Sequence, residues 1–448
     1  MYLRIIFVTL LSVIGTAQDS SSKPSTVFVI AGRLLDVRAA KYLANQGVLI
    51  ENDKIKEVGP LESVRSHAPR DARIIDLSRA TVLPGLIDCH AHLLDAVTGI
   101  SPGDAILTAV AGLSPSKRVL LGAQMAREDL EAGFTTVRVV GHSGIDGDVA
   151  LRDAINEEMV PGPRVLASCR KLTPPGGQAV RLNHAVAEPI LEQEFLQVSS
   201  ADEARKAVRE DLFYGADLIK VVADADNRLV TPQEMKAIAE EAHRSGVKVA
   251  VHATTVTGIQ TALDAGVDSI EHGDDVTDEQ LKAMHDRSIF FDLTQTLYGS
   301  RLNDLLGKSI ALSPEMKQEL ETYQKGQSQV VPALIQRVLK SGVKYAIGSD
   351  MWFSYPGKTR GQATAIMFDA MRELGLSPID IVRASTINAA ELIGWQDKVG
   401  VIEPGKYADI IAISGDPLQD ITELERVRFV MKGGAVVKNE VEKKQHLN

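Results

Sequence analysis

The pattern of apolar and polar positions changes twice along the chain. Residues 26–80 alternate in the manner of β-strands, as in TVFVIAGRLLDV and QGVLIENDKIKEVG, and Asn52 and Asp53 fit a hairpin turn. The alternation returns after residue 395, in DKVGVIEPGKYADIIAIS and RVRFVMKGGAVVKN. Strand patterns at both ends of a differently organised centre predict one small β-sandwich domain built from both termini.

In the centre, short apolar segments alternate with helical ones. Eight segments have the character of buried strands: TVLPGLIDCH, FTTVRVVG, PRVLASC, DLIKVVAD, KVAVHAT, SIEHG, IFFDLT and KYAIGSD. Helices are expected at 117–132, 149–158, 201–214, 232–245, 256–265, 277–287, 314–341, 361–374 and 378–393. This repetition predicts an α/β fold of the (β/α)8 TIM-like barrel type, with a doubly wound open sheet as the alternative.

The domain plan follows from these changes of pattern. We expect a signal peptide at 1–17, the first part of the small β domain at 18–80, the barrel at 81–394, the second part at 395–440 and a disordered tail at 441–448. The signal peptide is indicated by Arg4, the apolar run 5–14, and small Gly15 and Ala17 before a cut ahead of Gln18. An exported protein, periplasmic or secreted, is therefore expected; an uncleaved anchor or a buried strand is the alternative.

Composition narrows the range of partners. The formal net charge of −10 over 448 residues argues against a nucleic-acid partner, because no basic stripe compensates for it. No apolar stretch of about 18 residues follows the N-terminal run, so we expect no membrane span in the mature protein. Cys89 and Cys169 are too few for a disulfide framework and are expected to be free and buried.

Side chains that bind metals gather at the predicted strand ends. They are His90 and His92 on the first strand, His252 on the fifth, His272 on the sixth and Asp350 on the eighth. Catalytic side chains of a (β/α)8 barrel lie at the C-terminal ends of its strands, where these five would meet. Imidazoles suit Zn²⁺, and a carboxylate completes an open catalytic site. Any one of them alone fits an ordinary strand residue, but the set predicts a metal centre.

A sixth candidate ligand lies inside the strand DLIKVVAD. Lys220 has apolar neighbours on both sides, and an ammonium in an apolar strand is costly. A desolvated lysine has a lowered pKa, and its neutral amine can add CO₂ to give a carbamate, an anionic ligand whose two oxygens can bridge two metals. The alternative is that Lys220 reaches solvent or pairs with Asp224 or Asp226.

Whole segments of the chain resemble the amidohydrolase superfamily. The matching segments are PGLIDCHAHL, ADLIKVVAD, VAVHATT, SIEHGDDV, AIGSDM and STINAAELIGWQDKVGVIEPGKYADIIAISGDPLQDI, with GPRVLAS and LTPPGG in support. The resemblance covers nearly the whole chain after the signal peptide. It is greatest to imidazolonepropionase-like enzymes, a subgroup that includes Xaa-Pro dipeptidases (prolidases), Xaa-Arg/Lys carboxypeptidases and ochratoxin-cleaving amidases.

The resemblance implies two Zn²⁺ ions, or another divalent metal, and a substrate that is a dipeptide or another small molecule. The implied ligands are His90, His92 and Asp350 for the more buried ion, His252 and His272 for the second, and carboxylated Lys220 as the bridge. It also implies attack by a metal-bridging hydroxide, with Asp350 as proton shuttle, which agrees with two-metal and acid–base chemistry. Substrates would be Xaa-Pro or other Xaa-amino acid dipeptides or N-acyl amino acids, and a homo-oligomer is expected.

Three positions depart from the family pattern, and they leave the substrate open. Val139 stands where relatives often carry an acid, Gln178 where they often carry histidine, and Thr254 where many carry an aromatic residue or histidine. The candidate substrate contacts are His142, after the second strand, and Tyr298, in a loop; both also fit ordinary surface positions.

Two other functions remain open at this point. The first is an imidazolonepropionase-like hydrolase or deaminase of a cyclic amide or heterocycle, or an ochratoxin-type amidase. Ring-cleaving relatives generally lack the lysine of the fourth strand, so Lys220 distinguishes them. The second is a non-catalytic barrel that serves as a structural or regulatory partner. Such relatives lose ligands, whereas all six are present in this chain.

Overall fold

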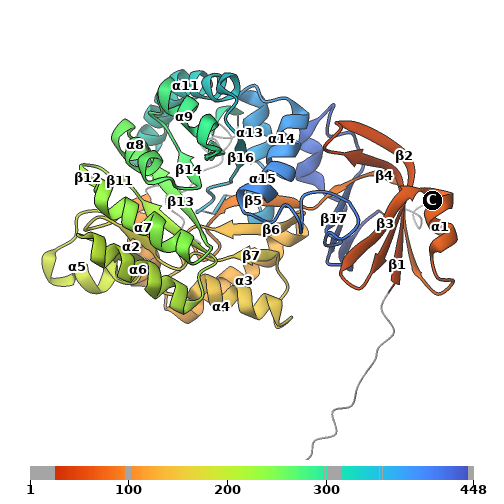
Figure 1. The fold of residues 1–448 in the computed structure, drawn as a ribbon, viewed down its shortest axis with the longest axis horizontal. Coiled ribbons are helices and arrows are strands. Elements are labelled where there is room, and N and C mark those ends of the chain that lie inside the picture. The colour runs from red at the N-terminus through yellow and green to blue at the C-terminus, as the bar shows by residue number, and fades with distance from the viewer. Residues whose placement is uncertain are drawn as a thin grey trace, which may run out of the picture.

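The computed structural model describes residues 26–95, 102–296, 298–300, 314–352, 354–355 and 357–441. A helix-covered barrel and a smaller sheet domain lie side by side in it (Figure 1). The predicted signal peptide and residues 442–448 of the predicted tail lie outside the described residues, so those two predictions stay untested.

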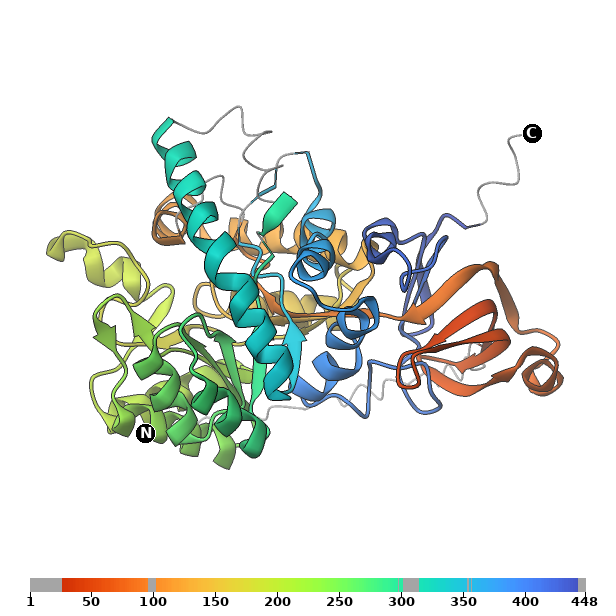
Figure 2. The same cartoon turned by 90° about the horizontal axis from the view of Figure 1, so that it is seen from above.

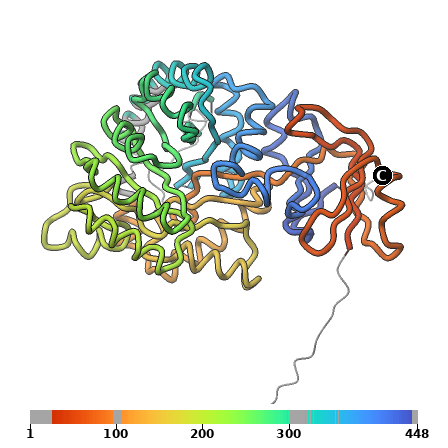
Figure 3. Tube along the Cα trace, viewed as in Figure 1, coloured from red at the N-terminus to blue at the C-terminus, as the bar shows by residue number. Residues whose placement is uncertain are grey.

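One seven-stranded sheet takes strands from both ends of the chain (Figures 1 and 3). Its strands are β1 (Thr26–Asp36), β2 (Lys41–Glu51), β3 (Lys54–Pro60), β4 (Arg73–Pro84), β17 (Ile410–Ile413), β18 (Phe429–Lys432) and β19 (Ala435–Asn439). β17 pairs antiparallel with β4 and so joins the two ends. Asn52 takes a left-handed backbone conformation, φ 56°, in the predicted hairpin turn between β2 and β3. Helix α1 (Leu61–His67) follows β3.

Eight parallel strands form the barrel. They are β5 (Leu86–Ala91), β6 (Phe134–Val139), β7 (Arg164–Leu166), β10 (Leu218–Val222), β13 (Lys248–Ala253), β14 (Ser269–His272), β15 (Phe290–Leu293) and β16 (Tyr345–Ile347). The third strand breaks at Cys169, whose φ is 58°. Beyond the break, β8 (Lys171–Thr173) pairs with β10 on one side and with β9 (Phe195–Gln197) on the other. The predicted TIM-like barrel with a β domain from both termini is confirmed.

The barrel closes between its first and eighth strands. The Asp350 N–H donates to the His90 carbonyl at 2.8 Å. The Asp88 carboxylate accepts from the His90 N–H at 3.0 Å and from the Ser349 N–H at 2.8 Å. A Cβ on Gly348 would lie 2.2 Å from the Cβ of His90, so only glycine allows this approach. The closing seam thus fixes the backbone of two predicted metal ligands.

Helices cover the outside of the barrel (Figure 2). They include α3 (Pro115–Glu131), α4 (Gly147–Asn156), α6 (Ala201–Tyr214), α7 (Pro232–Arg244), α8 (Val256–Ala265), α9 (Asp278–Arg287), α11 (Pro314–Ser341), α12 (Arg360–Thr364), α13 (Met367–Glu373), α14 (Pro378–Ala384) and α15 (Ile387–Leu392). Thr231 and Thr277 start α7 and α9 with capping boxes, which satisfy free N–H groups of the first turn. Gly215 ends α6 in a left-handed conformation.

The structure differs from the predicted elements at two kinds of place. The segment TVLPGLIDCH is two strands: β4 extends to Pro84 in the small domain, and β5 begins at Leu86. The predicted helices 361–374 and 378–393 are each broken in two; in the second, the Ser385 and Thr386 hydroxyls donate back to carbonyls of the preceding turn. Elements not predicted are α1, α2 (Pro102–Gly112), β8, α5 (His184–Leu191), β9, β11 (Asp224–Ala225), β12 (Arg228–Leu229) and η1 (Ile421–Arg426).

Two smaller expectations can also be compared with the structure. Cys89 and Cys169 are both free and buried, as predicted. Within the described ranges, every helix is too short or too polar to cross a bilayer.

We predict that Phe429→Ala destabilises the fold by about 3–5 kcal/mol, because it removes a buried ring and leaves a cavity in the small domain. The free energy of unfolding from a denaturant titration measures the loss. Val437→Ala, at a half-exposed position on the neighbouring β19, is the control and should change stability by less than about 0.5 kcal/mol. Equal effects of the two substitutions would contradict the assignment of Phe429 to the core.

Candidate metal centre

The predicted ligands meet in one small cavity at the C-terminal ends of the barrel strands. Its volume is about 100 Å³. It is lined by His90, His92, Val140, His142, Lys171, Gln178, Lys220, His252, His272, Asp350 and Trp352. All six side chains predicted as ligands are in this set, and so is His142. Tyr298 is not; it is partly buried and packs against the main hydrophobic core.

Asp350 lies at the centre of the histidine group. Its Oδ1 is 3.1 Å from Nε2 of His92 and 3.7 Å from Nε2 of His90. Its Oδ2 is 3.8 Å from Nδ1 of His272. The ligand atoms of His90, His92 and Asp350 all lie within 4.8 Å of one another, close enough to share one ion. His252 continues the group, with its ring centroid 4.5 Å from that of His272.

In three of the imidazoles, one ring nitrogen, Nδ1, is hydrogen-bonded to a neighbouring protein group. Nδ1 of His90 lies 2.9 Å from Glu271 Oε2, Nδ1 of His92 lies 3.0 Å from the Gly141 carbonyl, and Nδ1 of His272 lies 2.8 Å from Thr294 Oγ1. This leaves Nε2 of each ring as the atom available to a metal. Tethering of the second nitrogen is the usual arrangement around metal-binding histidines, so these rings fit a divalent cation.

Two of the ligand candidates have backbone conformations that side chains other than glycine rarely adopt. φ is 70° at His272 and 46° at Asp350. Left-handed conformations at such residues cost about 1–3 kcal/mol each and concentrate at functional sites. Here they occur at the last residue of β14 and shortly beyond β16, where both side chains line the cavity.

The electrostatics of the cavity favours neutral rings and an ionised aspartate. Burial lowers the pKa of His90 and of His252 well below the usual range for histidine. Burial alone would raise the pKa of Asp350, but the interaction with His90 and the hydrogen bond with His92 outweigh it and hold that pKa far below its usual range. Neutral imidazole and ionised carboxylate are the forms that bind metals.

Lys220 is buried in β10 and faces the same cavity. Its side-chain nitrogen has no hydrogen-bond partner in the described part of the chain. Burial, ahead of the charge of Arg138, lowers its pKa to about 8, although the nearby carboxylates of Glu271 and Asp350 act in the opposite direction. Pairing with Asp224 or reaching solvent, the alternatives open from the sequence, is not what the structure has: Asp224 accepts from the Thr254 and Thr255 N–H groups.

A network of buried charges beneath the cavity was not predicted. Arg138 Nη2 donates to Glu271 Oε2 at 2.7 Å and to Asp292 Oδ2 at 3.0 Å. Because Glu271 also holds His90, the network fixes the orientation of a metal-ligand candidate. The signal was present in the sequence: all three charges interrupt apolar strands, as Lys220 does.

Lys171 is a second buried lysine that the sequence reasoning missed. Its Nζ lies 2.8 Å from Nε2 of His142 and 2.7 Å from Oε1 of Gln178. Nδ1 of His142 faces Asp95 Oδ2 at 2.9 Å. Nε2 of His142 is therefore occupied by Lys171, whereas Nδ1, although close to Asp95, makes no hydrogen bond in the described part of the chain.

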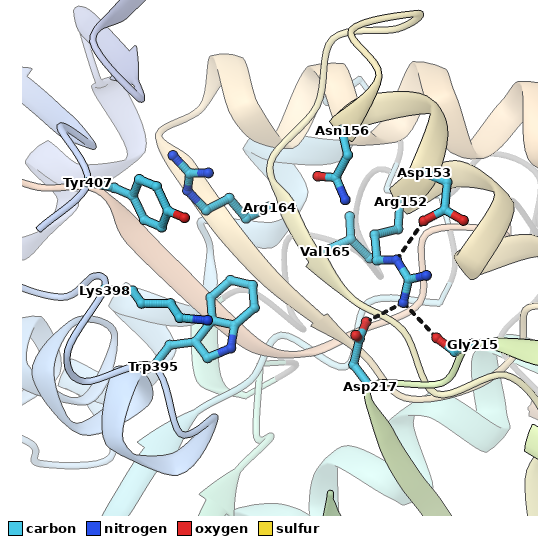
Figure 4. Close-up of a pocket in the computed structure, with 10 residues that line it drawn as sticks. All are labelled: Arg152, Asp153, Asn156, Arg164, Val165, Gly215, Asp217, Trp395, Lys398 and Tyr407. Carbon is cyan, nitrogen blue, oxygen red and sulfur yellow. Dashed lines mark hydrogen bonds and ion pairs between the residues drawn. The ribbon is translucent and has the colours of Figure 1, made fainter. Parts of the chain in front are cut away.

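A larger pocket, of about 470 Å³, lies at the opposite end of the barrel (Figure 4). Arg152 there pairs with Asp153 at 2.9 Å and with Asp217 at 2.7 Å. Arg164 pairs with Asp409 at 3.0 Å. Both arginines are thus paired with carboxylates. The pocket lies at the N-terminal ends of β7 and β10, and residues at this end of a (β/α)8 barrel typically serve stability, whereas catalytic residues lie at the other end. The smaller cavity is thus the candidate active site.

Comparison with known proteins agrees with the fold. Residues 81–437 match the amidohydrolase family. The chain therefore belongs to the amidohydrolase family, and it is accordingly a hydrolase. The resemblance read from its motifs is confirmed.

Individual relatives cover most of the chain. Ochratoxinase from Aspergillus niger is 27% identical over 94% of this chain and 88% of its own length. Imidazolonepropionase from Fusobacterium nucleatum subsp. nucleatum is 25% identical over 83% of this chain and 85% of its own length. Among solved structures, a Xaa-Pro dipeptidase with methionine bound in its active site is 30% identical, with a TM-score of 0.78, over 92% of this chain and 99% of its own.

We predict that Glu271→Gln weakens binding of a divalent metal about 10- to 100-fold, because His90 loses the anionic partner that orients its ring. Titration of the metal-free protein with Zn²⁺ measures the affinity, and circular dichroism checks the fold. Glu279→Gln, an exposed position on α9, is the matched control. Unchanged zinc affinity in a folded Glu271→Gln variant would contradict the orienting role.

Proposed function

We propose that the protein is a binuclear zinc-dependent hydrolase that cleaves the amide bond of a dipeptide or an N-acyl amino acid. The observation that carries the proposal is the convergence of four histidines, one aspartate and an unpartnered buried lysine on one cavity. No other described cavity of this chain combines histidines with acidic groups in this way.

The residues divide between two metal positions. His90, His92 and Asp350 would hold one ion, since their ligand atoms already lie together. His252 and His272 would hold the second, since their rings are neighbours. Divalent zinc fits this set because neutral imidazoles and a carboxylate are the ligands it prefers in catalytic sites.

Lys220 would join the two positions after modification by CO₂. Its neutral Nζ attacks the carbon of CO₂, an N–C bond forms, and Nζ loses one proton to solvent. The product is a carbamate anion with two oxygens. Burial without a partner supports this step: the group that is costly as an ammonium becomes a ligand whose charge the cations balance.

Asp350 would move the proton during hydrolysis. When bound, the two cations supply Lewis acidity, which polarises the substrate carbonyl and lowers the pKa of the attacking water. The Asp350 carboxylate, ionised and only partly buried, would accept a proton from that water and donate it to the leaving amine. The buried imidazoles around it exclude bulk water from the reacting groups.

The named relatives support amide substrates and leave two candidate reactions, hydrolysis of a linear amide and hydrolysis of a cyclic amide. The Xaa-Pro dipeptidase and the ochratoxinase favour a linear amide. The imidazolonepropionase favours a second candidate, hydrolysis of a cyclic amide. Lys220 favours the first candidate, because a bridging carbamate accompanies the binuclear site expected for amide cleavage.

The substrate is tested with a panel of Xaa-Pro, Xaa-Arg and Xaa-hydrophobic dipeptides, N-acyl amino acids and imidazolonepropionate. Zn²⁺ and bicarbonate are supplied. We expect turnover of at least one linear amide, its loss after chelation, and its return with Zn²⁺. Turnover of the cyclic substrate alone would overturn the first candidate in favour of the second, and turnover that survives complete removal of metal would overturn both.

We predict that Lys220→Ala abolishes turnover and lowers the zinc content, because the bridge between the two ions is lost. Metal analysis of the purified variant and a carbon-13 bicarbonate NMR signal in the wild type measure the two effects. Lys248→Ala, at the start of β13 where the side chain pairs with Asp268, is the control. Full zinc content with full turnover in Lys220→Ala would rule out the bridging role.

We also propose that the protein is exported, on the basis of the predicted signal peptide at 1–17. Amino-terminal sequencing of the protein from its native cells should begin at Gln18. An intact Met1 would overturn cleavage at this position.

A further inference from the structure

Lys171 is a buried lysine without an anionic partner. It is 1% exposed, and its stem lies against Gly141, where a Cβ would come within 2.5 Å of Lys171 Cγ. Both of its polar contacts, Nε2 of His142 and Oε1 of Gln178, are neutral acceptors. Within the described ranges, no carboxylate lies at ion-pair distance from its nitrogen.

Two acidic side chains near Lys171 pair with Arg118 instead, each through one carboxylate oxygen. Glu194 pairs with Nη1 of Arg118. Asp95 Oδ1 lies 3.5 Å from Nη2 of the same guanidinium. Their charge reaches Lys171 through space, but neither carboxylate contacts it. A buried ammonium in this position is costly unless an anion joins it.

The lysine lies next to the reacting groups. The ring of His142 connects it to a metal-ligand candidate, because the ring centroids of His142 and His92 are 4.6 Å apart. Lys171 and Gln178 both line the cavity that holds the ligands. Gln178 uses its carbonyl oxygen for Lys171, so its NH₂ group remains to donate to a ligand.

We infer that Lys171 is a specificity-determining residue that receives, together with Gln178, a free carboxylate adjacent to the scissile amide of the substrate. The substrate class is thus an amide of an amino acid whose carboxyl group is unblocked. This inference rests on the proposed amide hydrolysis. It assigns recognition of the substrate carboxylate to Lys171 on β8 and to Gln178, where relatives often carry histidine, rather than to His142 or Tyr298.

The test compares a carboxylate substrate with its neutral counterpart. The carboxylate-bearing member of the panel with the fastest turnover is measured beside its methyl ester, by release of the acyl product. The wild type should prefer the acid. Lys171→Met should lower kcat/KM for the acid at least about tenfold, mainly through a higher KM. It should change kcat/KM for the ester by less than about twofold.

The ratio of acid to ester separates recognition from a structural role. A substitution that only disturbs the structure would lower kcat/KM for the acid and the ester by similar factors. That result, or a wild-type preference for the ester, would overturn the inference. Lys398→Met makes the same chemical change in the pocket at the opposite end of the barrel and should keep the wild-type ratio. Lys171→Gln is the second variant if Lys171→Met does not fold.

A binding arm distinguishes failure of this inference from failure of the proposed function. Calorimetric titration with N-acetyl-L-phenylalanine and its methyl ester needs no turnover. If the wild type hydrolyses no amide, the proposed function fails. Preference for the free acid that is lost in Lys171→Met would still support the anion site, and equal binding of both compounds by the wild type would overturn it.

Discussion

Burial of ionised side chains between parallel strands is the constraint on which the site depends. An isolated charge in this environment is costly, so each one needs a partner that is fixed in place. Arg138 supplies such a partner for Glu271 and Asp292 at once. Glu271 then has a defined position from which to hold His90. The orientation of His90 therefore depends on a network of charges beneath the cavity, which is buried from solvent.

The same constraint explains why the two lysines that line the cavity differ from Arg138. Arg138 has planar donors that satisfy several acceptors together. Lys220 and Lys171 carry a compact amino group at the cavity surface, and neither contacts a carboxylate in the described ranges. Because both amino groups line the cavity without a carboxylate contact, they mark the two places where a group from outside is expected: CO₂ at one and a substrate anion at the other.

Much of the fold and the ligand set could be predicted because both are repeated local signals. Each barrel strand is a short apolar segment, and His90, His92, His252, His272 and Asp350 each follow or end one. Lys171 escaped notice because it follows the left-handed turn at Cys169, where the apolar pattern of the third strand is already broken. The partnership of Arg138, Glu271 and Asp292 joins three strands, so no local pattern contains it. The division of TVLPGLIDCH at Gly85 also depends on a distant contact, the pairing of β4 with β17.

That pairing has a consequence for the order in which the chain acquires its structure. β4 is complete at Pro84, but its neighbour β17 begins at Ile410. During synthesis, one edge of the first-made strands stays open until the whole barrel has been translated. Such long-range pairing slows folding, and an open strand edge invites aggregation. About the last forty residues thus supply the strands that cover this edge. A nascent chain that stalls before they are made would expose the edge of β4, which chaperones could bind.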